Sequence, residues 1–188
     1  MIDIMVDSDE LDVLLDARLS GLRVATYADL VTPEFLARTG HRLTVIDRGR
    51  GDPHACATVA DCEPGALSVP ESVSRVRHWL ADGRHQPTIY HDRATWHDVN
   101  TAGAGVPFAH WVSTLDGTLV PSGYYMAAVQ FAGAKTLGFH ADMSIVWDDH
   151  WHAPASPAAP GDAAHLRALA GAALAAVTDL THAVGVTG

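Results

Sequence analysis

Two carboxylates spaced two positions apart, Asp61 and Glu63, are the residues of this sequence best suited to acid–base chemistry. They follow a short apolar run at residues 55–60, which we expect to form a strand. Side chains at positions i and i+2 of a strand point to the same face, so the two carboxylates should project together. Carboxylates held close together cannot both ionise freely. One pKa therefore rises and its owner can donate a proton, as general acid cleavage of a glycosidic bond requires.

Further polar and aromatic residues are expected near the same place. Asp7 ends the first expected strand and Asp142 opens the last one, and in a closed barrel these two strands are neighbours. Carboxylates from several strands would then meet at one mouth. Aromatic rings, on which the apolar faces of sugars stack, stand near other strand ends, at Tyr27, Tyr90, Trp111 and Phe131.

The elements that must position these residues follow from eight short apolar runs. We expect strands at residues 2–6, 22–27, 43–46, 55–60, 88–90, 108–112, 126–131 and 143–147. Helical patterns fall mainly between the first five, for example at residues 70–82, where a proline opens and a glycine closes the segment. The later intervals are too short for full crossover helices. The pattern predicts an α/β fold, an irregular TIM-like barrel of about five β/α units followed by three strands, over residues 1–152. An open doubly wound sheet is the competing architecture, but no glycine-rich phosphate loop follows any strand.

The composition changes after the last expected strand. Residues 153–161 are rich in alanine and proline and are predicted to form a linker, and residues 162–188 a C-terminal helix and tail. The apolar residues of this helix follow a 4-3 rhythm. That rhythm suits a helix packed on its own barrel and equally a coiled-coil seam that would join copies into a homo-oligomer.

Charge and composition exclude several classes of partner. The chain has 188 residues, of which 48% are hydrophobic, and a formal net charge of −10, which repels the phosphate backbone of nucleic acids. No window is apolar enough to span a bilayer, and the first residues lack the basic start of a secretory signal, so synthesis in the cytoplasm is expected. Cys56 and Cys62 are too far apart along one strand to bridge and are expected to be free thiols.

Several of these segments, taken in order, resemble one known family. They are Val6-Asp7-Ser8, Val24-Ala25-Thr26-Tyr27, Val59-Ala60-Asp61-Cys62-Glu63, Thr88-Ile89-Tyr90, His110-Trp111-Val112 followed by Asp116-Gly117, Ala128-Val129-Gln130-Phe131, and Asp142-Met143-Ser144. Their order and spacing resemble those of glycoside hydrolase family 25, the lysozyme-like muramidases. Within this family they are most similar to lysins from phages of actinobacteria and their relatives. The resemblance covers roughly residues 1–152.

The resemblance implies roles for individual residues. Glu63 would be the general acid, Asp61 and Asp142 would orient the acetamido group of the substrate or stabilise the developing cation, and Asp7 would complete the acidic cluster. The implied substrate-binding residues are Tyr27, Tyr90, Trp111, Gln130 and Phe131. The implied reaction cleaves the β-1,4 bond between N-acetylmuramic acid and N-acetylglucosamine in a peptidoglycan strand, with no metal or organic cofactor.

Other interpretations stay open at this point. The same barrel could be a non-catalytic structural module of a phage particle, or a module that binds the cell wall. A metal-dependent hydrolase using His150 and His152 is a weaker option, because no third histidine has ligand spacing. Asp47 ends the third expected strand, where it would either join the site or pair with Arg48 or Arg50.

Overall fold

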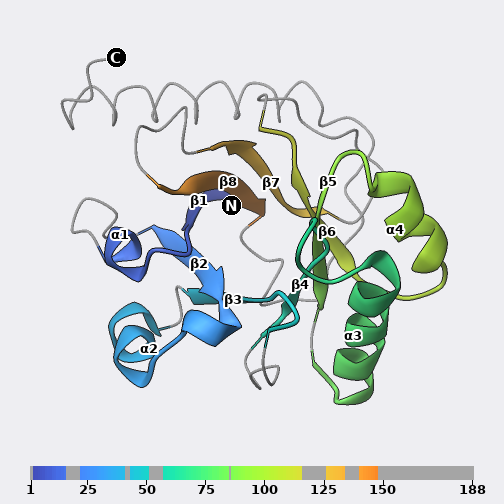
Figure 1. The fold of residues 1–188 in the computed structure, drawn as a ribbon, viewed down its shortest axis with the longest axis horizontal. Helices are drawn as coiled ribbons and strands as arrows, with labels where there is room; N and C mark the ends of the chain where they lie inside the picture. The colour runs from blue at the N-terminus through green and yellow to red at the C-terminus, as the bar shows by residue number, and fades with distance from the viewer. Residues whose placement is uncertain are drawn as a thin grey trace.

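Eight strands close into one barrel in the order β1 to β8 (Figure 1). The computed structural model describes residues 2–15, 22–40, 43–50, 57–84, 86–115, 126–133 and 140–147. The strands are β1 (Ile2–Asp7), β2 (Arg23–Tyr27), β3 (Leu43–Asp47), β4 (Val59–Asp61), β5 (Thr88–Asp92), β6 (Ala109–Ser113), β7 (Met126–Ala132) and β8 (Asp142–Trp147). The predicted TIM-like α/β barrel is therefore confirmed. The predicted linker and C-terminal helix, together with Cys56, His150 and His152, lie outside the described residues.

Strands β1 to β7 of this barrel run in one direction, and β8 runs in the opposite direction. Each pair from β1–β2 to β6–β7 is parallel, whereas β8 runs antiparallel to both of its neighbours, β7 and β1. The first residue of β8 therefore lies beside the last residue of β1, and Asp142 is the direct register partner of Asp7. In an all-parallel barrel the start of β8 would lie at the opposite end. The reversal of β8 is what brings Asp142 to the mouth formed by the other strands' carboxyl ends.

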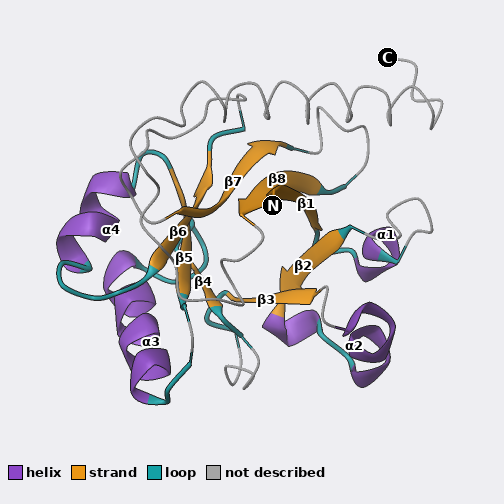
Figure 2. Cartoon of the chain, turned by 180° about the vertical axis from the view of Figure 1, so that it is seen from behind, coloured by secondary structure: helices purple, strands orange, loops and turns teal. Residues whose placement is uncertain are grey.

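Short helices flank the barrel on two sides. Figures 1 and 2 show α1 (Leu11–Leu14) and α2 (Pro33–Thr39) beside β1–β3, and α3 (Val69–Ala81) and α4 (Trp96–Ala102) on the other side. A short 3₁₀ helix, η2 (Ala28–Leu30), follows β2 directly.

The ends of the longer helices have the caps that their sequences predict. The hydroxyl of Thr32 accepts the backbone N–H of Phe35 at 3.1 Å before α2. Before α3, the carboxylate of Glu71 accepts the backbone N–H of Ser68 at 2.8 Å. Capped in this way, α3 packs its apolar face, which includes the fully buried Trp79, onto the outside of the barrel.

Alternating side chains along each strand divide between the barrel interior and its outer surface. The interior cluster consists of Met5, Ala25, Ile46, Val59, Tyr90, Trp111, Ala128 and Val146. The intervening residues face outward: Val6 and Ile145 belong to a cluster with Phe35 of α2, while Ala60 and Cys62 pack with α3. This alternation sends Asp7 and Asp61 to the same side as the interior cluster. Within the described residues, no helix is long and apolar enough to cross a membrane.

Candidate active site

The four predicted carboxylates lie at one end of the barrel. Asp7 and Asp61 are the last residues of β1 and β4, Asp142 is the first residue of β8, and Glu63 follows β4 by two positions. Their charges act on one another, because Asp142, Glu63 and Asp61 all raise the pKa of Asp7. The structure therefore brings together at one mouth the residues that the sequence places far apart.

A tight turn after β4 holds the Asp61–Glu63 pair. The Asp61 carboxylate accepts the backbone N–H of Glu63 at 2.9 Å, and the Asp61 carbonyl accepts the N–H of Leu67 at 3.0 Å. Gly65, at φ +93°, supplies the left-handed conformation with which the chain turns back. Asp61 is 3% exposed, whereas Glu63 is half-buried. Glu63 is thus the more exposed of the two carboxyls, although neither lines the cavity that Asp7 and Asp142 border.

Burial shifts the protonation of both members of this pair. Removal from water, and then the neighbouring Glu63 charge, raise the pKa of Asp61 from 3.8 to about 7. Burial likewise raises the pKa of Glu63, an effect that the Tyr90 hydroxyl opposes and the charges of Asp92 and Asp142 increase. The pair can therefore hold a proton at a pH where ordinary surface carboxyls have lost theirs.

Gln130 links the other two carboxylates. It is 1% exposed, and its Nε2 donates to Asp7 Oδ2 at 3.2 Å and to Asp142 Oδ2 at 3.1 Å. The Tyr90 hydroxyl donates to Gln130 Oε1 at 2.7 Å, which fixes the orientation of the amide. The second oxygen of Asp7, Oδ1, is buried without a hydrogen-bond partner among the described residues. Burial and the charge of Asp142 consequently raise the pKa of Asp7 well above its ordinary value.

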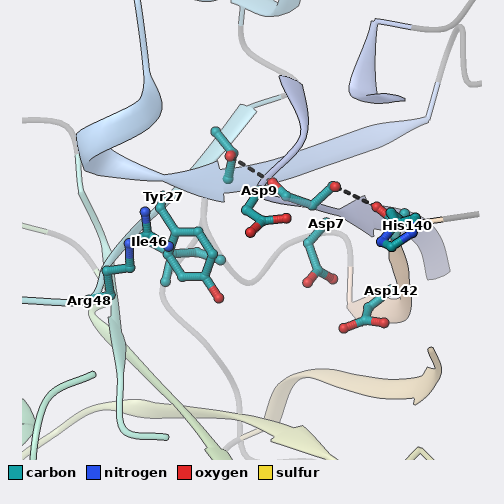
Figure 3. A pocket seen from close by; sticks show the side chains of 10 residues that line it. Asp7, Asp9, Tyr27, Ile46, Arg48, His140 and Asp142 are labelled. Carbon is teal, nitrogen blue, oxygen red and sulfur yellow. Dashed lines mark hydrogen bonds between the residues drawn. The ribbon is translucent and has the colours of Figure 1, made fainter. Parts of the chain in front are cut away.

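A cavity of about 280 Å³ opens beside this network (Figure 3). We call it the mouth cavity. Its lining residues are Asp7, Ser8, Asp9, Thr26, Tyr27, Ile46, Arg48, His140, Ala141 and Asp142. In Figure 3 the carboxylates of Asp7 and Asp142 face each other at one end, and the Tyr27 hydroxyl points toward them from the other side. The cavity thus combines an aromatic ring with carboxylates, as a sugar-binding site does.

The predicted substrate-binding residues take four different positions. Tyr27 lines the mouth cavity, whereas Tyr90 and Gln130 are buried in the network that holds the carboxylates. Trp111 is fully buried in the barrel interior, where its Nε1 donates to Ser144 Oγ at 3.0 Å, so its ring supports the site from within. Phe131 is 4% exposed and packs in the outer cluster with Val6 and Phe35, on the opposite face of β7 from Gln130. Its side chain therefore lies away from the mouth.

Three charged residues at the mouth, Asp92, Asp9 and Arg48, were not predicted as site residues from the sequence. Asp92 ends β5 and raises the pKa of Glu63, while its own carboxylate accepts the N–H of Thr95 at 2.7 Å. Its place as the last residue of a barrel strand is the feature that could have identified it. The other two, Asp9 and Arg48, follow β1 and β3 and line the mouth cavity.

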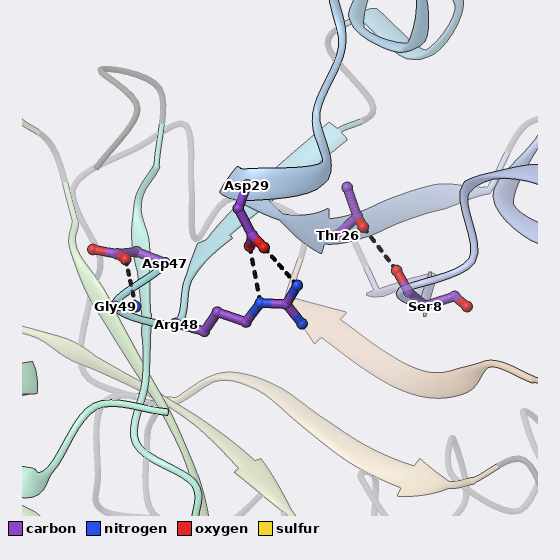
Figure 4. Close-up of polar contacts among 6 residues, drawn as sticks. All are labelled: Ser8, Thr26, Asp29, Asp47, Arg48 and Gly49. Carbon is purple, nitrogen blue, oxygen red and sulfur yellow. Dashed lines mark hydrogen bonds and ion pairs between the residues drawn. The ribbon is translucent and has the colours of Figure 1, made fainter. Parts of the chain in front are cut away.

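The pairing of Asp47 and Arg48 differs from expectation. Asp47 pairs with Arg75 of α3 at 2.9 Å and accepts the N–H of Gly49, whereas Arg48 forms a two-point ion pair with Asp29 of η2 (Figure 4). Consecutive residues of an extended chain point to opposite faces, so Asp47 turns outward and Arg48 turns to the cavity. Asp47 is thus held in the helix–barrel contact by Arg75, and from there its charge contributes to the raised pKa of Asp61.

Comparison with known proteins adds no further assignment. No protein-family model, curated protein or solved structure matches this chain. Over the described part of the chain, no group of three histidine, cysteine or acidic side chains is arranged to hold a metal ion. What is established is an eight-stranded mixed β/α barrel of TIM-like shape with a carboxylate-lined mouth.

Proposed function

We propose that the chain is a peptidoglycan-directed glycoside hydrolase of the family 25 type. It would cleave the β-1,4 bond between N-acetylmuramic acid and N-acetylglucosamine, at the cell wall or as part of a phage particle. The observation that carries the proposal is the convergence of Asp7 from β1, Asp61 and Glu63 from the end of β4, and Asp142 from β8 on one mouth, where burial raises the pKa of the first three.

Glu63 is the general acid in this proposal. Its raised pKa and partial exposure suit a group that must be protonated and also touch the glycosidic oxygen. As the bond breaks, positive charge develops on the sugar ring, and nearby carboxylates stabilise it. Asp61 and Asp142 supply this stabilisation and orient the acetamido group.

The network behind the site keeps these groups in place. Gln130 holds Asp7 and Asp142 by hydrogen bonds, and the Tyr90 hydroxyl holds Gln130. A catalytic group displaced by about 1 Å can cost about a hundredfold in rate. The proposal therefore assigns Gln130 and Tyr90 to positioning and not to contact with the sugar.

The proposal is tested by Glu63→Gln, which keeps the shape of the side chain and removes the proton. We expect clearance of a suspended cell-wall preparation to fall by about a hundredfold or more, with the thermal unfolding midpoint unchanged. Glu34→Gln, on the exposed surface of α2, is the matched control and should clear walls like the wild type. Equal clearance by wild type and Glu63→Gln would show that Glu63 is not the acid.

Binding and cleavage of the same cell-wall preparation by the wild type distinguish the hydrolase from the non-catalytic alternative. If the wild type sediments with cell walls but releases no new reducing ends from them, the barrel is a binding module. If it neither binds nor cleaves, the peptidoglycan proposal fails altogether.

A further inference from the structure

Arg48 is a cation held in a fixed orientation at the edge of a largely acidic cavity. Its Nε and Nη2 donate to the two oxygens of Asp29 at 2.9 Å and 2.6 Å. Its guanidinium carbon lies 4.1 Å from the centre of the Tyr27 ring, a cation–π contact. Two partners, Asp29 of η2 and Tyr27 of β2, thus hold the Arg48 side chain directly after β3, whereas a solvated surface arginine makes at most one weak ion pair.

The remaining donors of Arg48 form a second edge of the guanidinium. A guanidinium carries five N–H groups in a planar fork. Asp29 occupies the edge made by Nε and Nη2, and among the described residues no hydrogen bond is made by Nη1. The edge made by Nη1 and Nη2 therefore matches a second carboxylate in a two-point arrangement.

The position of this edge sets the kind of ligand that fits. Figure 3 places Arg48 and Tyr27 at one end of the mouth cavity and Asp7 with Asp142 at the other. The acidic end favours an uncharged part of a ligand, because a second anion there would be repelled. Asp9 also lines the cavity, and its charge acts on Arg48. A carboxylate therefore fits where the Nη1–Nη2 edge of Arg48 can pair with it, with neutral sugar extending across Tyr27.

From this arrangement we infer that Arg48 binds a carboxylate carried by the glycan, and so makes the mouth selective for acidic sugars over uncharged N-acetylglucosamine polymers. The inference rests on the proposed function, since it places a glycan across the mouth. In peptidoglycan such a carboxylate has two sources: the lactyl group of muramic acid where no peptide is attached, and the free acids of the stem peptide where one is.

The experiment measures binding, so that its outcome does not depend on turnover. Protein carrying Glu63→Gln is titrated calorimetrically with three ligands of similar length: peptide-free peptidoglycan strands, peptide-bearing muropeptides, and a chitooligosaccharide. Adding Arg48→Gln should weaken binding of at least one acidic ligand about tenfold, the effect of losing one charged hydrogen-bonding partner, and leave the chitooligosaccharide unchanged. The ligand that loses affinity identifies the source of the carboxylate.

Two further variants make the result interpretable. Arg38→Gln, in the last turn of α2 and exposed, is the matched control and should alter none of the three affinities. If Arg48→Gln does not fold, Arg48→Lys keeps the charge without the paired edge, and should still weaken only the acidic ligands. An equal loss for all three ligands, or no loss for any, would overturn the inference. Selective binding without cleavage by the wild type would instead refute the hydrolase proposal and leave this inference standing.

Discussion

Replacing Asp61 by asparagine should make the barrel more stable, and increasingly so as the pH rises. Asp61 is 3% exposed, and its carboxylate accepts one backbone N–H from Glu63, which an asparagine oxygen can also accept. Burial raises the pKa of Asp61 from 3.8 in the unfolded chain to about 7. Between these values the folded state binds more protons than the unfolded one, so stability is present at low pH and lost as the pH rises through the folded pKa.

The size of the effect follows from the same two values. One unit of pKa difference corresponds to about 1.4 kcal/mol. Linkage then gives a loss of wild-type stability from Asp61 of less than about 1 kcal/mol at pH 4, about 2 kcal/mol at pH 5 and about 4 kcal/mol at pH 7, which the neutral asparagine avoids.

Urea unfolding of the wild type and Asp61→Asn at pH 4, 5, 6 and 7 measures this difference directly. The two proteins should be nearly equal at pH 4, and the gap should widen toward pH 7. Asp98→Asn, on the exposed surface of α4, is the control and should shift stability by less than about 0.5 kcal/mol throughout. A gap that is constant with pH, or a variant less stable than the wild type at pH 7, would refute the raised pKa of Asp61.

Two further predictions concern buried polar groups. Gln130→Leu should lower the free energy of unfolding by about 2–4 kcal/mol, because it removes a buried amide that accepts from the Tyr90 hydroxyl and donates to the carboxylates of Asp7 and Asp142. A change below about 1 kcal/mol in urea unfolding would contradict this. Nδ1 of His110 lies 3.0 Å from Nε2 of His91. Burial, and to a smaller extent the neighbouring His91, lower the pKa of His110 to about 3. NMR titration should therefore find His110 neutral at pH 5, and a midpoint near 6.5 would show that the pair is not buried.

The barrel was predictable because its strands carry a local pattern. Eight apolar runs of strand length, separated first by helical segments and then by short intervals, leave few architectures other than a closed mixed barrel. The direction of β8 was less obvious. The chain between Ala132 and Asp142 is too short for a crossover helix, and an antiparallel turn is the connection that such a length allows.

The partners of individual charges could not be predicted in the same way. Alternation along a strand says which side a residue faces, and it separates Gln130 from Phe131 and Asp47 from Arg48. It does not say how deep a residue lies, so Trp111 was predicted to bind substrate at the mouth, whereas its side chain is fully buried in the barrel interior. Nor does it say which element lies opposite: Arg75 and Asp29 come from helices whose packing onto the barrel is a tertiary property.

Two buried aspartates, Asp47 and Asp61, differ in whether a cation neutralises their charge. Asp47 is 2% exposed and is stabilised by an ion pair with Arg75 and a backbone N–H, as a buried carboxylate in a structural role should be. Asp61 is as deeply buried, yet it accepts one backbone N–H and forms no ion pair with any described residue. The chain can evidently neutralise a buried acid where structure requires it. Leaving Asp61 with a raised pKa next to Glu63 costs stability that an asparagine would restore, and groups of this kind concentrate at sites that transfer protons.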